Sequence, residues 1–302
     1  MSSKPESTFL VVTTTWNSVD HIETFLRHYS RLGFERVLVM DFDSTDGTLE
    51  ILASTQWRGF VELVPFPGIE SLDSSNVMLA LAKRKFPETH WCLFCDPDEL
   101  LVTPTMEVGD FGPDLVMGNL QVSVPRFNVT GPRSIAEHDD QRMTARDALA
   151  LRIDGRCSRN PAIDGQALVL DPPWIFTAIP GKTCVRLGSA LSIGGGDHHA
   201  QTVAERSLTA SAGIYLLHYP FRSYAAFAKK IEMARINFAS NHVDQPGYGW
   251  QLRRWIRLAE SEGLYEEYLQ QFIPDGDVES MVQAGKLTRD DAIRNFSHRE
   301  FC

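Results

Sequence analysis

The sequence predicts an α/β fold: a mixed, mostly parallel sheet flanked by helices, with a helical region at the C-terminal end. From residue 9 to residue 101, short apolar runs alternate with segments of helical periodicity, as is typical of strands joined by right-handed crossover helices. Polar turns follow several of these runs. Beyond residue 200 the apolar side chains recur mostly at helical spacing.

The composition is that of a globular protein without a nucleic-acid partner. Of 302 residues, 43% are hydrophobic, which is enough for one large domain or two. The net charge of −10 argues against a nucleic-acid interface, which needs a basic face. Five cysteines predict reduced, mostly buried thiols in a cytoplasmic protein. No signal-peptide core is visible and no apolar run reaches the roughly 18 residues of a membrane span, although peripheral membrane association stays open.

The first expected elements alternate between strand and helix. Residues 9–12 are apolar and β-rich, which predicts a buried strand. Residues 19–32 carry apolar side chains at helical spacing and end at Gly33, a typical helix stop. Residues 36–40 predict a second strand, and residues 49–52 belong to a second helix.

Three more elements continue this alternation. Residues 60–64 predict a strand and residues 72–86 a helix. Residues 91–95, Trp-Cys-Leu-Phe-Cys, predict another buried strand. The alternation therefore extends over three helices and four strands of one sheet.

An acidic turn follows the last of these strands. Asp96, Asp98 and Glu99 come directly after the apolar run, and buried strands exclude such side chains. Converging carboxylates repel one another unless a cation joins them. Mn²⁺ and Mg²⁺ take oxygen ligands, and Mg²⁺ sites often use one or two carboxylates with substrate phosphates. We expect such a metal here; a solvated surface turn is the simpler alternative.

Two other polar turns are expected beside the acidic one. Residues 13–17 follow the first strand and residues 41–46 follow the second. Parallel strands end at the same edge of a sheet, and such sheets bind ligands outside that edge. The three turns therefore predict one site.

The second half of the chain has weaker patterns. Residues 120–124 and 182–187 predict strands, the latter bearing two cations. Residues 194–199 join three glycines to Asp197 and two histidines, which suits either a ligand-binding loop or a plain turn. The apolar run 214–217 leads into His218. Helices are predicted within residues 224–235 and 250–272, and residues 278–293 suggest a helical tail.

These motifs resemble the glycosyltransferase family 2 superfamily, and most of all its family 2-like branch related to family 92. The first strand ends in a polar turn with Asn17, and residues 41–48 match the pattern D-x-x-S-x-D-G-T. Residues 91–100 match W-x-x-x-x-D-x-D-E-L. A distal H-Y-x-x-x-S…K pattern is matched by residues 218–223 with Lys229 or Lys230.

The resemblance implies a GT-A (Rossmann-like) fold and a metal-dependent, inverting hexosyltransferase. Such an enzyme moves a sugar from a nucleotide diphosphate donor, here expected to be a UDP-sugar, to the hydroxyl of a glycan, lipid-linked or small-molecule acceptor. Mn²⁺ or Mg²⁺ would be its cofactor. Residues 1–200 would form the nucleotide-sugar-binding and catalytic domain, and residues 201–302 a helical region that completes the site.

The resemblance also implies roles for particular residues. The nucleotide side would use Thr13, Thr14, Asn17, Asp41, Asp43, Asp73, Asn76, Asp96 and Lys229. The metal ligands would be Asp96, Asp98 and His218, with His198 and His199 as competitors for the histidine role. The general base would be Glu99, Asp164 or Asp197, left unranked.

Two departures from the pattern stand out. Ser75 precedes Asn76 where relatives often have an Arg that helps to hold the diphosphate, so its neutralisation is left to the metal and other basic groups. Pro97 lies inside the acidic motif and stiffens that turn.

Two other functions compete with glycosyl transfer. A nucleotidyltransferase can use a similar sheet, but that class usually opens with a Gly-rich, basic loop, and residues 13–17 contain neither glycine nor a cation. A non-catalytic nucleotide- or sugar-binding module is the other alternative. Intact Asp96, Asp98 and His218 count against it.

Overall fold

The computed structural model describes residues 7–65, 74–112, 118–137, 150–156, 171–241 and 249–298. The chain divides into two compact units. Unit 1 comprises residues 1–126 and 180–217, and unit 2 comprises residues 127–179 and 218–302. The boundaries differ from the expected one at residue 200 because strands formed after residue 180 belong to unit 1, whereas residues 127–179 group with the C-terminal helices. The functional roles expected for residues 1–200 and 201–302 stay predictions.

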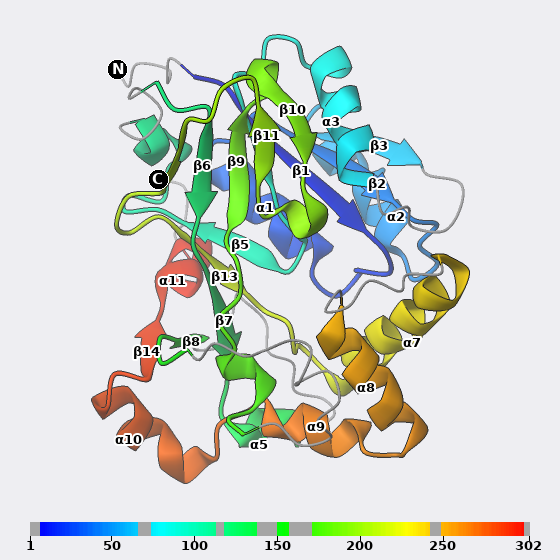
Figure 1. Ribbon diagram of the computed structural model, residues 1–302, viewed down its shortest axis with the longest axis vertical. Coiled ribbons are helices and arrows are strands. Elements are labelled where there is room, and N and C mark those ends of the chain that lie inside the picture. The colour runs from blue at the N-terminus through cyan, green and yellow to red at the C-terminus, as the bar shows by residue number, and fades with distance from the viewer. Residues whose placement is uncertain are drawn as a thin grey trace. The chain divides into compact units, whose positions relative to one another are not determined.

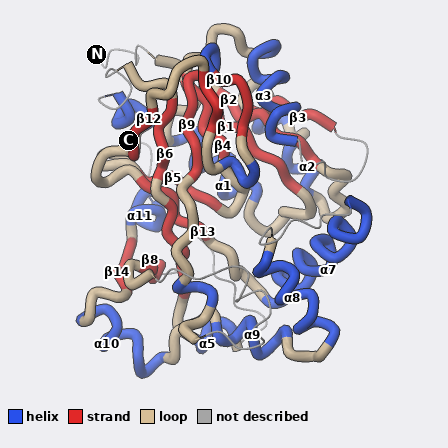
Figure 2. The backbone as a smooth tube through the Cα atoms, in the orientation of Figure 1, coloured by secondary structure: helices blue, strands red, loops and turns tan. Residues whose placement is uncertain are grey.

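A seven-stranded mixed sheet forms the centre of unit 1, in the order β12-β6-β9-β4-β1-β2-β3 (Figure 1 and Figure 2). The pairs β1–β2, β1–β4, β2–β3 and β6–β12 are parallel, and β9 is antiparallel to both β4 and β6. This confirms the predicted mixed, mostly parallel α/β sheet. Its strands are β1 (Phe9–Thr15), β2 (Arg36–Asp41), β3 (Val61–Pro65), β4 (Trp91–Phe94), β6 (Gln121–Val124), β9 (Lys182–Arg186) and β12 (Ser207–Thr209).

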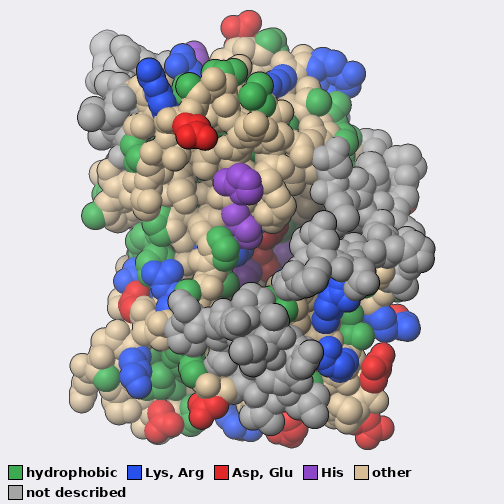
Figure 3. Space-filling view, viewed as in Figure 1, with side chains coloured by type: hydrophobic (Ala, Val, Ile, Leu, Met, Phe, Trp, Pro, Cys, Tyr) green, Lys and Arg blue, Asp and Glu red, His purple; other side chains and the backbone are tan. Residues whose placement is uncertain are grey.

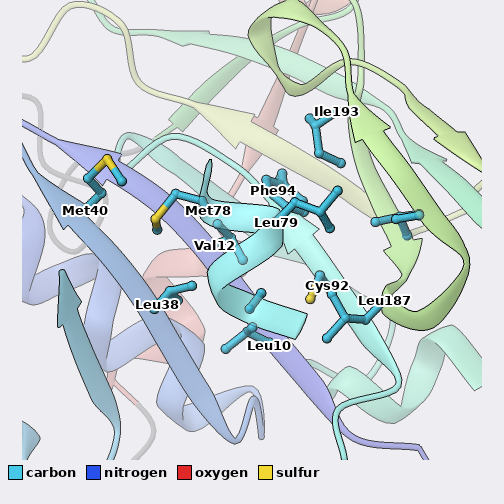
Figure 4. Packing of buried hydrophobic residues seen from close by; sticks show 13 residues of the cluster. Leu10, Val12, Leu38, Met40, Met78, Leu79, Cys92, Phe94, Leu187 and Ile193 are labelled. Atoms are coloured by element: carbon cyan, nitrogen blue, oxygen red, sulfur yellow. The ribbon is translucent and has the colours of Figure 1, made fainter. Parts of the chain in front are cut away.

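Helices cover the sheet because its central strands bury alternate side chains on both faces. Leu10 and Val12 of β1 face α3 (Ser74–Lys85), where they join Met78 and Leu79 in one core cluster (Figure 4). Phe9 faces the other way, toward the side covered by α1 (Ile22–Arg31), and its ring lies 5.9 Å from that of Phe34. The short α2 (Thr48–Leu52) follows β2, as the sequence predicts.

An antiparallel hairpin of β10 (Ala190–Ile193) and β11 (Ala200–Thr202) extends the face covered by α3. Ile193 packs in the α3 cluster, and its backbone bonds to the Asn76 amide: its N–H donates to Oδ1 at 2.7 Å and its carbonyl accepts from Nδ2 at 3.2 Å. The hairpin is thereby tied to the start of α3. Short 3₁₀ turns complete the unit: η1 (Thr55–Trp57), η2 (Val108–Phe111), η4 (Leu187–Ser189) and η5 (Gly195–Asp197).

The acidic turn is followed by a strand that the sequence analysis did not predict, β5 (Glu99–Val102). It neighbours β13 (Tyr215–His218) in a second sheet. Side chains of α1 hold β5 in place, because the Tyr29 hydroxyl donates to the Glu99 carbonyl at 3.0 Å and His28 Nε2 donates to the Leu101 carbonyl at 2.7 Å. Glu99 therefore starts a buried strand instead of belonging to an exposed turn.

Three antiparallel strands that lie almost wholly in unit 2 have the order β14-β8-β7 (Figure 1). They are β7 (Arg126–Thr130), β8 (Ala150–Ile153) and β14 (Leu287–Asp290). β14 interrupts the predicted helical tail, because Leu287 and Asp290 are buried and Asp290 pairs with Arg152 of β8 at 3.1 Å. Most of β11 and all of β12 and β13 likewise place strands in residues 201–302, the region expected to be helical.

Helices make up most of the remainder of unit 2, as predicted. Their aromatic side chains pack edge-to-face, with ring centroids 5.2 Å apart for Trp174 and Trp255 and 5.1 Å apart for Phe227 and Trp255. No described helix is long and apolar enough to cross a bilayer. The elements are α5 (Arg133–Ala136), η3 (Trp174–Phe176), α7 (Tyr224–Asn241), α8 (Trp250–Glu260), α9 (Leu264–Gln270), η6 (Asp275–Asp277), α10 (Val278–Gln283) and α11 (Ala292–His298).

Three of the five cysteines, Cys92, Cys95 and Cys184, are free and buried, as expected for reduced thiols. Cys92 and Cys95 have the spacing C-x-x-C, but side chains three residues apart along an extended chain point to opposite faces. Cys92 joins the α3 cluster, whereas Cys95 Sγ lies 3.3 Å from the Tyr29 hydroxyl of α1. Cys157 and Cys302 lie outside the described residues.

Candidate functional site

Polar segments meet at one edge of the unit 1 sheet because of strand direction. β1, β2 and β4 are parallel, so their carboxyl ends share an edge. β9 is antiparallel to β4 and β6, so the start of β9 and the end of β6 lie at that same edge. Lys182 is the first residue of β9, and Arg126 follows the end of β6. Topology thus brings two cations to the acidic turn after β4.

The Lys182 ammonium lies between three carboxylates. It donates to Asp96 Oδ2 at 2.9 Å and to the Gly196 carbonyl at 3.0 Å. Its Nζ is also 3.7 Å from Glu99 Oε2 and 3.7 Å from Asp197 Oδ2. Although burial alone lowers the pKa of Lys182, these acids raise it well above its usual value, so the side chain stays charged.

Glu99 links the second cation to the acidic turn. Its side chain is fully buried; Oε1 accepts a hydrogen bond from Arg126 Nη1, and Oε2 accepts from the Asp96 N–H at 2.9 Å. Arg126 Nε in turn donates to the Pro180 carbonyl at 3.1 Å. Burial raises the pKa of Glu99 to about 7, while Lys182 and Arg126 oppose that rise. These contacts favour Glu99 as a residue that positions the turn rather than one that meets a substrate.

Asp96 and Asp98 are the accessible acids of the turn. The Asp96 side chain is 44% exposed, and Asp98 is half-buried. Desolvation raises the pKa of Asp96, but the charge and hydrogen bond of Lys182 together with the charge of Arg126 outweigh this effect and hold that pKa below its usual value. Asp96 is therefore a carboxylate at neutral pH with one face toward solvent.

The two acids are compatible with a metal that arrives with its ligand. Among the described residues, no group of three or more His, Cys, Asp or Glu side chains is arranged to hold a metal ion. Mg²⁺ commonly takes only one or two carboxylates and completes its shell with substrate phosphates and water. Asp96 and Asp98 fit that donor set.

Asp197 approaches the same edge from the glycine-rich turn. Its backbone has φ of 61°, a left-handed conformation unusual for a non-glycine residue, and its side chain is 18% exposed. Ser75 Oγ donates to Asp197 Oδ1 at 2.5 Å. Burial raises the pKa of Asp197, and Lys182 partly opposes this rise. A partly exposed carboxylate with a raised pKa suits proton transfer.

Two histidines, His198 and His199, follow Asp197 along the chain. Histidine side chains are among those visible at the surface in Figure 3. His198 Nδ1 lies 2.9 Å from the Gly181 carbonyl, which can only accept, so Nδ1 carries a proton. Burial and nearby Arg126 lower the pKa of His198 to about 4, so the ring is neutral. His199 is exposed.

The glycines of this turn leave room for the two histidine rings. A Cβ on Gly194 would collide with the ring of His199, and one on Gly196 would lie 2.6 Å from His198 Nε2. Gly196 also has φ of 68°. Close packing against the two rings therefore accounts for at least two of the three glycines.

The turn after β2 is organised around Asp41, which is buried. Asp41 Oδ1 accepts from the Ser44 N–H at 2.8 Å and Oδ2 accepts from Ser44 Oγ at 2.6 Å. Asn17 ties this turn to the end of β1: its N–H donates to Ser44 Oγ at 2.7 Å and its Oδ1 accepts from the Thr45 N–H at 2.8 Å. Asp43 is exposed, with φ of 58°. Asp43 is thus better placed than Asp41 to meet a ligand.

The other residues predicted for the site are partly within and partly outside the described residues. Thr13 is buried and Thr14 half-buried at the end of β1, whereas the Asn76 amide is used by the backbone of β10. Asp73 and Asp164 lie outside the described residues.

His218 and Lys229 belong to unit 2, and their roles stay predictions from the resemblance. Asn128 Nδ2 donates to the Ile175 carbonyl at 2.9 Å, which fixes the amide orientation. Asn128 Oδ1 therefore accepts from His218 Nδ1 at 2.8 Å. A metal-binding histidine and a hydrogen-bonded core histidine both show this arrangement. Lys229 is exposed on α7.

Sequence reasoning did not assign Lys182 and Arg126 to the site. The available signal was a lysine that opens a predicted strand, since an ammonium buried in a sheet needs acidic partners. To place Lys182 beside the acidic turn one also has to know the direction of β9, which no local pattern encodes.

No protein-family model matches the chain, and the search of curated proteins found no match. Solved structures do match. S. aureus TarS is 16% identical over 85% of this chain and 43% of its own, with a TM-score of 0.43. TarS residues 1–349 in complex with UDP-GlcNAc are 14% identical over 92% of both chains, with a TM-score of 0.41.

GalNAc-T7, solved with UDP, GalNAc and Mn²⁺, is 12% identical over 93% of this chain and 58% of its own, with a TM-score of 0.39. The chain spans less than half of the longer TarS chain that it matches. TarS and GalNAc-T7 are glycosyltransferases, the class that the sequence motifs resemble. At these identities and TM-scores the likeness says nothing about the ligands of this chain, which have to be argued from the site.

Proposed function

We propose that this protein is a glycosyltransferase that moves a sugar from a UDP-linked donor to an acceptor hydroxyl with the help of Mn²⁺ or Mg²⁺. One observation carries the proposal: the accessible carboxylates Asp96 and Asp98 sit at the carboxyl edge of a mostly parallel sheet, held there by buried Glu99. That edge is where such sheets bind nucleotides.

The reaction needs the leaving diphosphate to be neutralised. A divalent cation bound by Asp96 and Asp98 would supply positive charge to the departing phosphate oxygens. Lys182 and Arg126 add fixed positive charge at the same edge. They can therefore replace the arginine that the sequence lacks before Asn76.

The attacking hydroxyl needs a base, and Asp197 fits that role best among the described candidates. Its side chain is partly exposed, oriented by Ser75, and has a raised pKa. Glu99 is fully buried and bonded to Arg126, so it cannot reach an acceptor without breaking that pair. Removal of the acceptor proton by Asp197 during one direct displacement would invert the anomeric carbon.

The nucleoside is expected at the neighbouring turns. Asp43 is exposed beside the ordered Asn17–Ser44 contact, and a carboxylate there can accept from the uracil N–H or a ribose hydroxyl. The expected acceptors remain a glycan, a lipid-linked molecule or a small molecule, in a cytoplasmic protein that associates with membranes at most peripherally.

The direct test is a panel of nucleotide sugars, each incubated with and without Mn²⁺, with nucleotide release measured and UDP binding followed by calorimetry. We expect Mn²⁺-dependent release from a UDP-sugar and loss of release in Asp98→Asn. Asp110→Asn is a matched control, because Asp110 accepts from the Thr105 N–H at 2.7 Å in an exposed turn. If UDP does not bind in Mn²⁺ and no nucleotide sugar is turned over, the proposed function is wrong.

A further inference from the structure

Given the donor and metal proposed above, we propose that Lys182 occupies the cation position at Asp96 in the donor-free protein, so that the divalent metal binds only together with the nucleotide diphosphate. This role of Lys182 rests on the proposed function and adds an order of events to it. A binding site filled by a side chain of the protein is closed to free metal and opens when the donor arrives.

The contact between Lys182 and Asp96 carries this inference. The ammonium donates to Asp96 Oδ2 at 2.9 Å, a charge-assisted bond to one of the two expected metal ligands. The Lys182 side chain is 2% exposed and that of Asp96 is 44% exposed, so solvent screens their attraction only in part. A metal binding to Asp96 in the free protein has to compete with this bond and with the repulsion of a neighbouring positive charge.

Lys182 can release Asp96 without becoming an unpaired buried charge. Its Nζ already lies 3.7 Å from both Glu99 Oε2 and Asp197 Oδ2. A hydrogen bond to the Gly196 carbonyl at 3.0 Å fixes it further. These partners remain when Asp96 turns to a metal, so the exchange avoids the large cost of stranding a buried ion.

Binding of the nucleotide diphosphate favours the metal over Lys182 as the partner of Asp96. Mg²⁺ bound by one or two carboxylates relies on phosphate oxygens to complete its shell. The phosphates also bring negative charge, which removes the repulsion between the metal and Lys182. The Asp96 backbone stays in place during the exchange, because its N–H is held by Glu99, which is anchored by Arg126.

The test is Mn²⁺ binding measured by electron paramagnetic resonance, with and without UDP, in the full chain. Wild type should bind Mn²⁺ weakly alone and at least about tenfold more tightly with UDP, within the usual range of coupling between ligands. Lys182→Gln removes the charge but keeps a donor for Asp96, so Mn²⁺ alone should bind about tenfold more tightly and the effect of UDP should shrink.

A matched control is Lys85→Gln, which removes a lysine that pairs with Glu62 on the surface and should leave Mn²⁺ binding unchanged. Should Lys182→Gln fail to fold, the ammonium resonance of Lys182 in the wild-type protein decides. It should shift with Mg²⁺ plus UDP and stay unchanged with Mg²⁺ alone.

The role of Lys182 is overturned if Mn²⁺ binds wild type equally well without UDP, if the glutamine variant gains no affinity for free Mn²⁺, or if Mg²⁺ alone shifts the ammonium resonance. Each of these results leaves the proposed function standing as long as UDP binds. Failure of UDP to bind at all would instead overturn the proposed function.

Discussion

Two buried ion-pair networks, one in each unit, differ in whether their charges are matched. In unit 2, Arg254 and Glu267 form a pair at 2.6 Å with side chains 0% and 3% exposed. Trp255 Nε1 and Gln271 Nε2 donate to Glu267 Oε1 at 3.0 and 2.9 Å. In this pair one cation faces one acid, and two neutral donors also bond to the Glu267 carboxylate.

In unit 1, two cations are shared among more acids than they can neutralise. Lys182 and Arg126 contact Asp96, Glu99 and Asp197, and Asp98 follows in the same turn. A closed, matched pair has little reason to change partners. An open network with surplus negative charge has room for a further cation, which is why we propose this network, and not the pair in unit 2, as the one that binds ligands.

The largest expected effect tests the closed pair. Glu267→Ala leaves Arg254 as an uncompensated buried charge, so the free energy of unfolding should fall by about 3–5 kcal/mol. Urea unfolding followed by circular dichroism measures it. Glu279→Ala removes the acid of an exposed pair with Arg289 and is the control that should change little. Equal losses in both variants would mean that burial does not distinguish these pairs.

Removing an acid from the unit 1 network should lower activity without lowering stability. Asp98→Asn should lower kcat/KM by about 10²–10³-fold, the range for losing one electrostatic contact to a transition state. Its free energy of unfolding should stay the same or rise, since one source of repulsion disappears. Steady-state kinetics and urea unfolding of the same preparation separate the two effects. A variant that unfolds more easily yet keeps its activity would reverse the assignment.

A smaller effect is expected at the nucleoside turn. Asp43→Asn should weaken UDP binding by about 1–3 kcal/mol, as for the loss of a hydrogen bond to a charged group, without changing stability. Asp41→Asn is the companion variant. Because the Asp41 carboxylate accepts two hydrogen bonds from Ser44, this substitution should lower the free energy of unfolding in addition to weakening UDP binding. Calorimetry in Mn²⁺ checks the affinities. UDP binding that is unaffected in the Asp43 variant would move the nucleoside away from this turn.

The smallest expected effect is a displacement of the pH profile. Asp197 must be ionised to act as a base, so kcat/KM should fall as the pH is lowered through its pKa, which lies above the ordinary 3.8 because of burial. Ser75→Ala removes a bond that stabilises the carboxylate, so the acid limb should move to higher pH.

Ser134→Ala is the control for that displacement, because Ser134 makes the same kind of bond to Asp275 in unit 2. An acid limb that stays in place in Ser75→Ala, or that moves equally in Ser134→Ala, would remove Asp197 from the role of base.

The sequence predicted most of the sheet and the acidic turn because these depend on local pattern. Buried strands such as β1 and β4 are continuous apolar runs, and the acids must lie beyond their ends. The place of Lys182 in the site could not be predicted, because its contact with Asp96 joins residues 86 positions apart and depends on the direction of β9, which the sequence does not state. β14 was missed because Leu287–Asp290 is mostly polar, and only its pairing with β8 makes it a strand.

The placement of the buried thiols gives the two faces of the sheet separate reporters. Cys92 packs beneath α3, whereas Cys95 and, by its register opposite Leu93, Cys184 lie on the face covered by α1. A thiol reagent reaches either face only when its covering helix lifts. With Cys157 and Cys302 replaced by serine, the labelling rates of single-cysteine forms therefore measure the opening of each layer independently.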